Sequence, residues 1–252
     1  MINVLLSGCN GKMGQVITRL SEQRDNLRIC AGYDLNSSIK NSYPVFSDLK
    51  KCDVQIDVII DFSHPSALEP LIEFALNRKI PAVISTTGLN PEQVKMLRDV
   101  SKYIPIFFSA NMSLGVNLLI DLVKKAARVL EDNFDIEIVE KHHNQKIDAP
   151  SGTALAIADA INTALSEPQE YIYDRHSRRK KRSKKEIGMH AVRGGTIVGD
   201  HSVIFAGNDE IIEINHIATS KEIFAVGSLN AAAFLYDKKP GMYSMDDLIG
   251  SK

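Results

Sequence analysis

The chain has 252 residues, of which 44% are hydrophobic and 24% are charged, and its formal net charge at pH 7 is −1. This composition is that of an ordinary folded protein and excludes disordered and fibrous classes, while the length fits one large domain or two smaller ones. The balanced charge gives no reason to expect a nucleic-acid partner. No apolar run is long enough to span a bilayer, so no membrane partner is expected.

The N-terminus and the cysteines bear on the cellular compartment. The first apolar run has no basic segment before it and meets glycine at once, so it does not resemble a signal peptide and a cytoplasmic protein is expected. Cys9, Cys30 and Cys52 lie about twenty residues apart and form no C-x-x-C pair. This spacing predicts reduced cysteines, with neither a disulfide framework nor a metal site.

Residues 1–112 alternate short apolar runs with helical patterns. The runs at 2–8, 27–34, 57–62, 81–88 and 104–110 each end in small or polar residues, as buried parallel strands do. Helical patterns cover 14–23, 65–79 and 90–103, the last with Pro91 suited to its first turn. Strand and helix in alternation predict an α/β fold with a Rossmann-like, doubly wound parallel sheet.

Residues 113–221 have a different rhythm, which predicts a second, α+β domain. Helical patterns cover 116–133 and 154–165, and strand patterns begin at Ile136 and cover 190–195, 197–207 and 209–219. The tripeptide Gly207-Asn208-Asp209 predicts a hairpin, so we expect a mixed, open and mostly meandering sheet. Residues 222–252 predict a helix and a tail that returns to the first domain, with hinges near 112–113 and 220–223 that allow domain closure.

A basic run at 175–186 is the one unusual segment in composition. It has no interleaved aromatic residues and no recognisable binding fold around it, which favours a solvated loop over a nucleic-acid contact.

Three glycines point to a dinucleotide. Gly8, Gly11 and Gly14 follow an apolar strand and open a helix, where the backbone can approach a pyrophosphate at the positive helix end. Asp34, twenty residues beyond Gly14, is placed to accept hydrogen bonds from ribose hydroxyls. A tight turn without a ligand would explain the glycines alone, but Lys12 adds a cation at the phosphate position. Because Leu35 follows Asp34 and no arginine is adjacent, NADH is expected to be used at least as well as NADPH.

Further cofactor contacts are expected where the parallel strands end, because ligands of such sheets bind beyond the carboxyl ends of the strands. Phe62 is placed to pack on the cofactor, Thr86 and Thr87 to reach the nicotinamide ribose, and the segment from Ala110 to Met112 to frame the carboxamide. His64 has no assigned role.

The stretch from Glu137 to Leu155 gathers groups suited to a dianion. His143 and Lys146 precede Ser151, a good helix N-cap, and the first-turn amides of Gly152 and Thr153 would form a carboxylate cradle. Neighbouring residues on a strand point to opposite faces, so at most one of His142 and His143 should be buried unless the strand ends there.

Seven segments in order resemble the 4-hydroxy-tetrahydrodipicolinate reductase family, also called dihydrodipicolinate reductase: GCNGKMG, DFSHPSAL, STTGL, SANMSLGVN, EKHHNQKIDAPSGTAL, IVGDHSVIF and GMYSMDDLI. The resemblance covers essentially the whole chain. It implies a homotetramer that uses NAD(P)H to reduce a cyclic dicarboxylate in lysine and diaminopimelate biosynthesis, with loss of a hydroxyl group as water.

The resemblance also implies roles for individual residues. His142 corresponds to a general acid/base, Lys146 to a proton donor, and His143, Gly152 and Thr153 to substrate contacts. The implied cofactor contacts are Gly8, Cys9, Asn10, Gly11, Lys12, Met13, Asp34, Ser85, Thr86, Thr87, Ser109, Ala110, Asn111 and Met112. Ser85 and Met112 depart from the glycine and phenylalanine of many members, and Leu35 replaces a basic residue found in some.

Two other functions remain open from the sequence. An amino acid or aldehyde dehydrogenase could share the frame, although none of the cysteines that an aldehyde route normally needs lies in the second domain. A redox-sensing NAD-binding regulator could instead use the basic run to contact DNA, with strongly salt-dependent binding.

Overall fold

The computed structural model describes residues 1–36 and 38–251, which form two compact units. Unit 1 comprises residues 1–114 and 222–252, and unit 2 comprises residues 115–221. Each unit has a sheet and a core of its own, and each is described by itself below.

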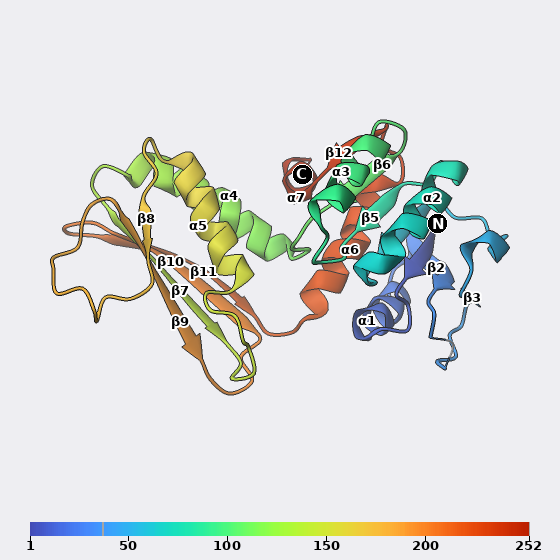
Figure 1. Ribbon diagram of the computed structural model, residues 1–252, viewed down its shortest axis with the longest axis horizontal. Helices are drawn as coiled ribbons and strands as arrows, with labels where there is room; N and C mark the ends of the chain where they lie inside the picture. The colour runs from blue at the N-terminus through green and yellow to red at the C-terminus, as the bar shows by residue number, and fades with distance from the viewer. Residues whose placement is uncertain (37, 252) are drawn as a thin grey trace. The chain divides into compact units, whose positions relative to one another are not determined.

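Unit 1 contains a seven-stranded sheet over the described residues, and every neighbouring pair in it is parallel (Figure 1). The strand order is β12-β6-β5-β4-β1-β2-β3, which confirms the predicted doubly wound sheet. The strands are β1 (Ile2–Ser7), β2 (Leu27–Tyr33), β3 (Val45–Phe46), β4 (Val58–Asp61), β5 (Ala82–Ile84), β6 (Pro105–Phe108) and β12 (Gly241–Tyr243).

Helices cover both faces of this sheet because successive strand residues point to opposite sides. Val4 and Leu6 join a core with residues of α1 (Lys12–Ser21), α6 (Glu222–Leu235) and α7 (Met245–Gly250). Leu5 joins the other core, with α2 (Leu68–Arg78) and α3 (Pro91–Val100). Short 3-10 turns, η1 (Leu49–Lys51) and η2 (Pro65–Ala67), complete this unit.

The C-terminal segment is built into unit 1. β12 pairs with β6 at the edge of the sheet, and Ala225 and Leu229 of α6 are fully buried in the core. Gly227 of α6 lies against the carbonyl of Met112, at a distance that leaves no room for a Cβ atom. The tail thus packs on the N-terminal part of the chain.

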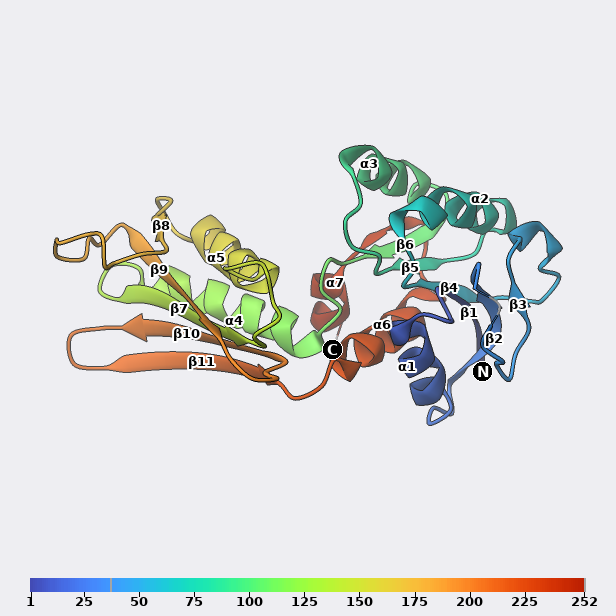
Figure 2. The same cartoon turned by 60° about the horizontal axis from the view of Figure 1, so that its bottom comes forward.

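Unit 2 contains a five-stranded sheet over the described residues, in the order β11-β10-β7-β9-β8. Its elements are α4 (Leu114–Leu130), β7 (Asp135–His142), α5 (Gly152–Ala164), β8 (Glu170–Ile172), β9 (Glu186–Arg193), β10 (Gly199–Ala206) and β11 (Ile211–Ala218). Helices α4 and α5 pack on one face, where Ile136, Ile138, Val203 and Phe205 form the core (Figure 2).

One expectation about unit 2 needs correction, and one strand was not expected. The sheet is mixed as predicted, and the hairpin at Gly207 joins β10 to β11, but the sheet is not a meander. β7 pairs with β10 on one side and, in parallel, with β9 on the other, because α5 and β8 intervene in the chain. β8 is a short strand without a clear alternation of apolar residues, which is why its sequence did not reveal it.

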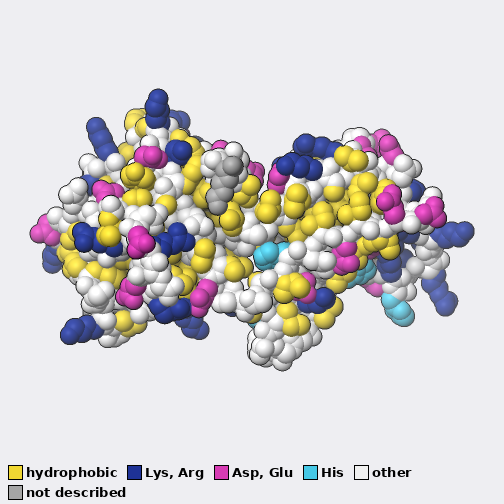
Figure 3. All heavy atoms as spheres, turned by 180° about the vertical axis from the view of Figure 1, so that it is seen from behind, with side chains coloured by type: hydrophobic (Ala, Val, Ile, Leu, Met, Phe, Trp, Pro, Cys, Tyr) yellow, Lys and Arg dark blue, Asp and Glu magenta, His cyan; other side chains and the backbone are white. Residues whose placement is uncertain are grey.

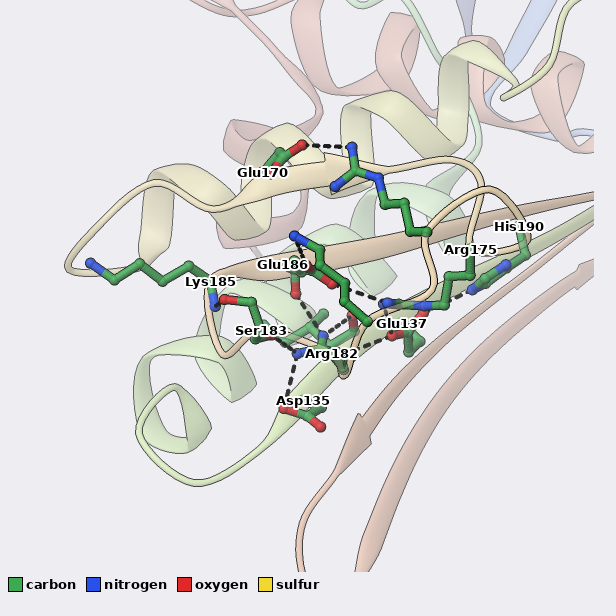
Figure 4. Close-up of polar contacts among 12 residues, drawn as sticks. Asp135, Glu137, Glu170, Arg175, Arg182, Ser183, Lys185, Glu186 and His190 are labelled. Carbon is green, nitrogen blue, oxygen red and sulfur yellow. Dashed lines mark hydrogen bonds and ion pairs between the residues drawn. The ribbon is translucent and has the colours of Figure 1, made fainter.

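The basic run at 175–186 is not simply a solvated loop. Arg182 donates to Asp135 and Glu137 at 2.9 Å and to the carbonyl oxygens of Ile136 and Glu186 (Figure 4). Arg175 donates to Glu137 at 2.9 Å and to Glu186 at 3.0 Å. Two arginines therefore hold the run against β7 and β9, while its other basic side chains are exposed.

Across residues 1–36 and 38–251, none of the helices has the length and apolar character needed to cross a membrane.

Candidate active site

A cavity of about 370 Å³ lies at the carboxyl ends of β1, β2 and β4 in unit 1. Five residues expected to contact a cofactor line it: Gly8, Asn10, Gly11, Asp34 and Phe62. Tyr33, Leu35, Asn36, Ser63 and His64 also contribute to the lining. The position matches the binding crevice of doubly wound sheets.

At two positions of the loop, a neighbouring backbone segment comes so close that only glycine fits. Gly8 has φ +77°, and a Cβ there would lie 2.4 Å from the carbonyl oxygen of Phe62. A Cβ on Gly14 would lie 2.2 Å from the carbonyl oxygen of Gly8. The loop, the first turn of α1 and the end of β4 therefore pack without side chains between them, as a pyrophosphate site requires.

Asp34 lies immediately after β2 and organises one wall of the cavity. Its Oδ2 accepts from the amide of Asn10 at 2.9 Å, and its Oδ1 accepts from the amide of Asn36 at 2.8 Å. The Asn10 side chain donates in turn to the carbonyl oxygen of Asn36. Each carboxylate oxygen has a further lone pair, so Asp34 can still accept hydrogen bonds from ribose hydroxyls.

Asp61, the last residue of β4, is fully buried beside the cavity and was not expected from sequence. Burial raises its pKa, although hydrogen bonds from Ser63 and Thr86 oppose the shift. Ser63 Oγ donates to Oδ1 and Thr86 Oγ1 to Oδ2, both at 2.6 Å. Asp61 thus ties the end of β4 to the end of β5.

The remaining expected cofactor residues lie outside the lining of this cavity. Lys12 is exposed at the first position of α1, whereas Cys9 and Met112 are buried in the core. Burial raises the pKa of the Cys9 thiol to about 12, so it is an unreactive core residue. Ser85 and Thr86, with exposed Thr87, follow β5, and Ser109, Ala110 and Asn111 follow β6. Met13 is half-buried against the core around β1.

In unit 2, the two adjacent histidines lie at the end of β7. His142 is the last residue of the strand and is buried, whereas His143 follows the strand and is half-buried. The Nδ1 atom of His143 is nevertheless buried without a hydrogen-bond partner among the described residues. A buried polar atom without a partner is costly, and a ligand would satisfy it.

Glu140 lies at the centre of the polar groups around His142. Its side chain is 1% exposed, and its Oε2 lies 2.6 Å from His142 Nδ1. Arg193 of β9 donates to both carboxylate oxygens, at 2.8 and 2.7 Å, and the amide of Ser151 donates to Oε1 at 3.0 Å. Burial alone would raise the pKa of Glu140, but the hydrogen bonds from Arg193, His142 and Ser151 hold it below its ordinary value.

Ser151 connects the same cluster to α5. It is the N-cap residue, and its Oγ accepts from the amide of Ala154 at 3.1 Å and lies 3.2 Å from Nε2 of His201. The His201 ring packs edge-on against the ring of His142, with centroids 5.2 Å apart. Burial lowers the pKa of His201 to about 4, and the neighbouring His142 adds to the shift, so His201 is neutral at pH 7.

Lys146 joins this group through the loop after β7. Its Nζ lies 2.8 Å from Asp148 Oδ1, and the carbonyl oxygen of Asp148 accepts from Arg193 at 2.7 Å. The expected residues His142, Lys146 and Ser151 are therefore linked in one network. Gly152 and Thr153 form the first turn of α5 beside it, where helix amides point outward.

Sequence reasoning missed Glu140, Arg193 and His201. The signal was present for Glu140, which lies two residues before His142 and so shares its face of the strand. Arg193 and His201 come from other strands, and their approach depends on the register of β7 with β9 and β10.

Family models match the chain over nearly its whole length. Residues 2–112 match the model "Dihydrodipicolinate reductase, N-terminus", and residues 115–249 match "Dihydrodipicolinate reductase, C-terminus". The chain belongs to the dihydrodipicolinate reductase family. The resemblance seen in the sequence motifs is thus confirmed.

Individual members of the dihydrodipicolinate reductase family agree with this assignment. The 4-hydroxy-tetrahydrodipicolinate reductase of Caldanaerobacter subterraneus subsp. tengcongensis is 56% identical over 99% of this chain and 98% of that protein. The enzyme of the same name from Clostridium tetani is 50% identical over 100% of this chain and 98% of that protein.

A solved structure extends the similarity to the fold. The dipicolinate-bound dihydrodipicolinate reductase from Paenisporosarcina sp. TG-14 superposes with a TM-score of 0.83, and 97% of each chain is covered. The identity of 24% means that this likeness concerns the fold alone.

Proposed function

We propose that the chain reduces 4-hydroxy-tetrahydrodipicolinate to tetrahydrodipicolinate with NAD(P)H, releasing the 4-hydroxyl group as water, in lysine and diaminopimelate biosynthesis. The observation that carries the proposal is the full-length identity of 56% to a reductase of that name. The geometry of unit 2 supports it, because the buried histidine, the lysine and the helix start suit an anionic heterocycle. Family membership argues against both the amino acid or aldehyde dehydrogenase and the DNA-binding regulator.

The cavity of unit 1 fits a dinucleotide. The glycine loop leads into the first turn of α1, where helix amides suit a pyrophosphate. Asp34 has lone pairs for ribose hydroxyls, and Phe62 provides an apolar surface. Residues from Ser85 to Thr87 and from Ser109 to Met112 would continue the site along the ends of β5 and β6. When bound, the nicotinamide supplies the hydride.

The lining of this cavity supports the use of NADH. Among the described residues, neither lysine nor arginine lines it, and the carboxylate of Asp34 would repel a 2′-phosphate. Leu35 is 81% exposed at the position where a cation would be needed. We therefore expect NADH to be used at least as well as NADPH.

The residues of unit 2 would bind the substrate and handle its proton. Lys146, His143 and the first-turn amides of Gly152 and Thr153 would bind the two carboxylates, by charge-assisted hydrogen bonds worth about 1.5–3 kcal/mol each. Hydride addition places electron density on the conjugated ring, which must then be protonated. His142 acts as general acid/base and Lys146 as proton donor.

Two variants test these roles by steady-state oxidation of NADH. Replacing His142 with glutamine removes the proton carrier, so kcat should fall by about 10²–10⁴-fold, the usual contribution of general acid–base catalysis. Lys146→Ala should lower kcat and also raise KM, because it removes both a proton donor and a carboxylate partner. A thermal melt of each variant like that of the wild type would show that the fold is intact. Wild-type turnover by His142→Gln would contradict the proposal.

We further propose a cytoplasmic homotetramer assembled through unit 2. The face of its sheet opposite α4 and α5 has no helix of the described residues packed on it, and Ile211 and Ile217 of β11 are 68% and 65% exposed. In Figure 3, hydrophobic side chains are visible on the surface of both lobes, including the lobe that contains this unit. An exposed apolar surface of this kind marks a site of association. A mass of four chains by light scattering is expected, and a monomer at all concentrations would exclude it.

A further inference from the structure

The proton-handling role of His142 raises the question of what fixes its proton. On the basis of the proposed function, we infer that Glu140 and Arg193 are positioning residues: they hold His142 in the tautomer that leaves Nε2 to exchange protons, and they hold the start of α5 beside it. Neither residue needs to contact the substrate for this role.

The hydrogen bonds around Glu140 determine the tautomer. Three of the nitrogens near its carboxylate can only donate: Nη1 and Nη2 of Arg193 and the amide nitrogen of Ser151. The fourth is Nδ1 of His142, at 2.6 Å from Oε2. A carboxylate held ionised by an arginine accepts only, so Nδ1 must carry the hydrogen and Nε2 is left to take up or release a proton.

The other ring nitrogen lies in a space kept by a glycine. A Cβ atom built on Gly199 of β10 would lie 3.2 Å from Nε2 of His142, a tight contact. Gly199 is the first residue of β10, two residues before His201, whose ring packs against His142. Glycine at position 199 therefore keeps a side chain from pressing on Nε2.

Glu140 also joins the two halves of the proposed substrate site. One oxygen faces His142, and the other accepts from the amide of Ser151, the N-cap of α5. Four donors use all the lone-pair positions of the carboxylate, so the group cannot rotate without losing a partner. A single buried side chain thus sets both the ring of His142 and the helix start that would bind a substrate carboxylate.

Glu140→Gln is the decisive substitution because it keeps the shape and changes an acceptor into a donor. Whichever way the amide is turned, its NH₂ group faces two nitrogens that donate in the wild type, so at least one of them loses its acceptor. We expect kcat to fall by about 10²-fold or more, toward the value of His142→Gln, with a much smaller change in KM.

Glu137→Gln is the matched control, because Glu137 has similar partners three residues earlier on β7. It accepts from His190 at 2.8 Å and from Arg175 and Arg182 at 2.9 Å, on the opposite face of the strand (Figure 4). A merely structural role for a buried carboxylate on β7 predicts the same loss of kcat in both variants. Our inference predicts a loss in Glu140→Gln and near-wild-type kcat in Glu137→Gln.

The imidazole nitrogen chemical shifts of ¹⁵N-labelled protein give a readout that needs no turnover. The wild type should show the neutral His142 ring protonated at Nδ1, assigned by the loss of its signals in His142→Gln, and Glu140→Gln should lose this preference. Arg193→Lys keeps the positive charge but not the paired donors. It should therefore retain the Nδ1–H tautomer, with a kcat between those of the wild type and Glu140→Gln.

The outcomes separate this inference from the proposed function. If the wild type fails to reduce the cyclic dicarboxylate but shows the Nδ1–H tautomer, the proposed function fails and the positioning stands. If Glu140→Gln keeps both the wild-type tautomer and kcat, or if Glu137→Gln loses as much activity, the inference is overturned. If Glu140→Gln does not fold, Arg193→Lys provides the test instead. An Arg193→Lys protein in which Nδ1 of His142 carries no proton would overturn the inference.

Discussion

At the residue scale, the sequence identified groups that act locally and missed those that act across strands. The glycine loop and the histidine pair could be predicted because each belongs to a short segment of sequence whose backbone conformation follows from its residues. Arg193 and His201 could not, because they reach His142 only through the register that pairs β7 with β9 and β10. Asp61 was hidden in an apolar run, and only its burial reveals its part in joining β4 to β5.

His201 gives a pH dependence that can be measured. Burial lowers its pKa in the folded protein from 6.5 to about 4, whereas the unfolded chain keeps the ordinary value. Between these values the unfolded state binds more protons, so the free energy of unfolding falls as pH falls from 6.5 to about 4 and this contribution is constant below that range.

His201→Gln removes the titrating group, and urea unfolding at several pH values measures the effect. The variant should lose part of the slope of stability with pH in that window. An unchanged slope in His201→Gln would contradict a buried neutral histidine at this position.

At the scale of elements, strand and helix patterns predicted most of both units, including α3, where Pro91 occupies the first turn as expected. Short edge strands escaped, since β3 and β8 span two and three residues and carry no alternation. The basic run was interpreted from its composition alone. Composition does not show that Arg175 and Arg182 have carboxylate partners on β7 and β9. The partners on β7 are distant from the run in the sequence, and Glu186 belongs to a strand.

Arg182 should be the main anchor of this run. Its side chain is 18% exposed and donates to two carboxylates and three carbonyl oxygens. Arg182→Ala would leave Asp135 and two strand carbonyls without these donors, so the free energy of unfolding should fall by about 2 kcal/mol. Lys181→Ala is the control, because Lys181 is exposed and its loss should cost less than about 0.5 kcal/mol.

Chemical denaturation of both variants measures the difference. Equal stabilities of Arg182→Ala and Lys181→Ala would show that the run is held by something other than these contacts.

At the scale of the whole molecule, the architecture of each sheet explains where the polar groups of each unit gather. A parallel sheet with helices on both faces leaves its strand ends for a ligand, and unit 1 has its glycine loop and Asp34 there. A mixed sheet with helices on one face can carry polar groups at the end of a strand, and unit 2 has its histidines, Glu140 and the start of α5 there. The fold class and the family could be predicted from the motifs. The contacts of Arg193 and His201 with the group around His142 could not, because they depend on how β7 pairs with β9 and β10.

The most direct test is to measure the oxidation of NADH and of NADPH by the wild-type enzyme, with substrate made in situ from pyruvate and aspartate semialdehyde. Oxidation should be rapid with this mixture, with NADH at least as effective as NADPH. It should be absent when pyruvate or oxaloacetate is offered with ammonia, as an amino acid dehydrogenase would require. Failure to oxidise either cofactor with the cyclic dicarboxylate, or turnover with an oxo acid and ammonia in its place, would contradict the account.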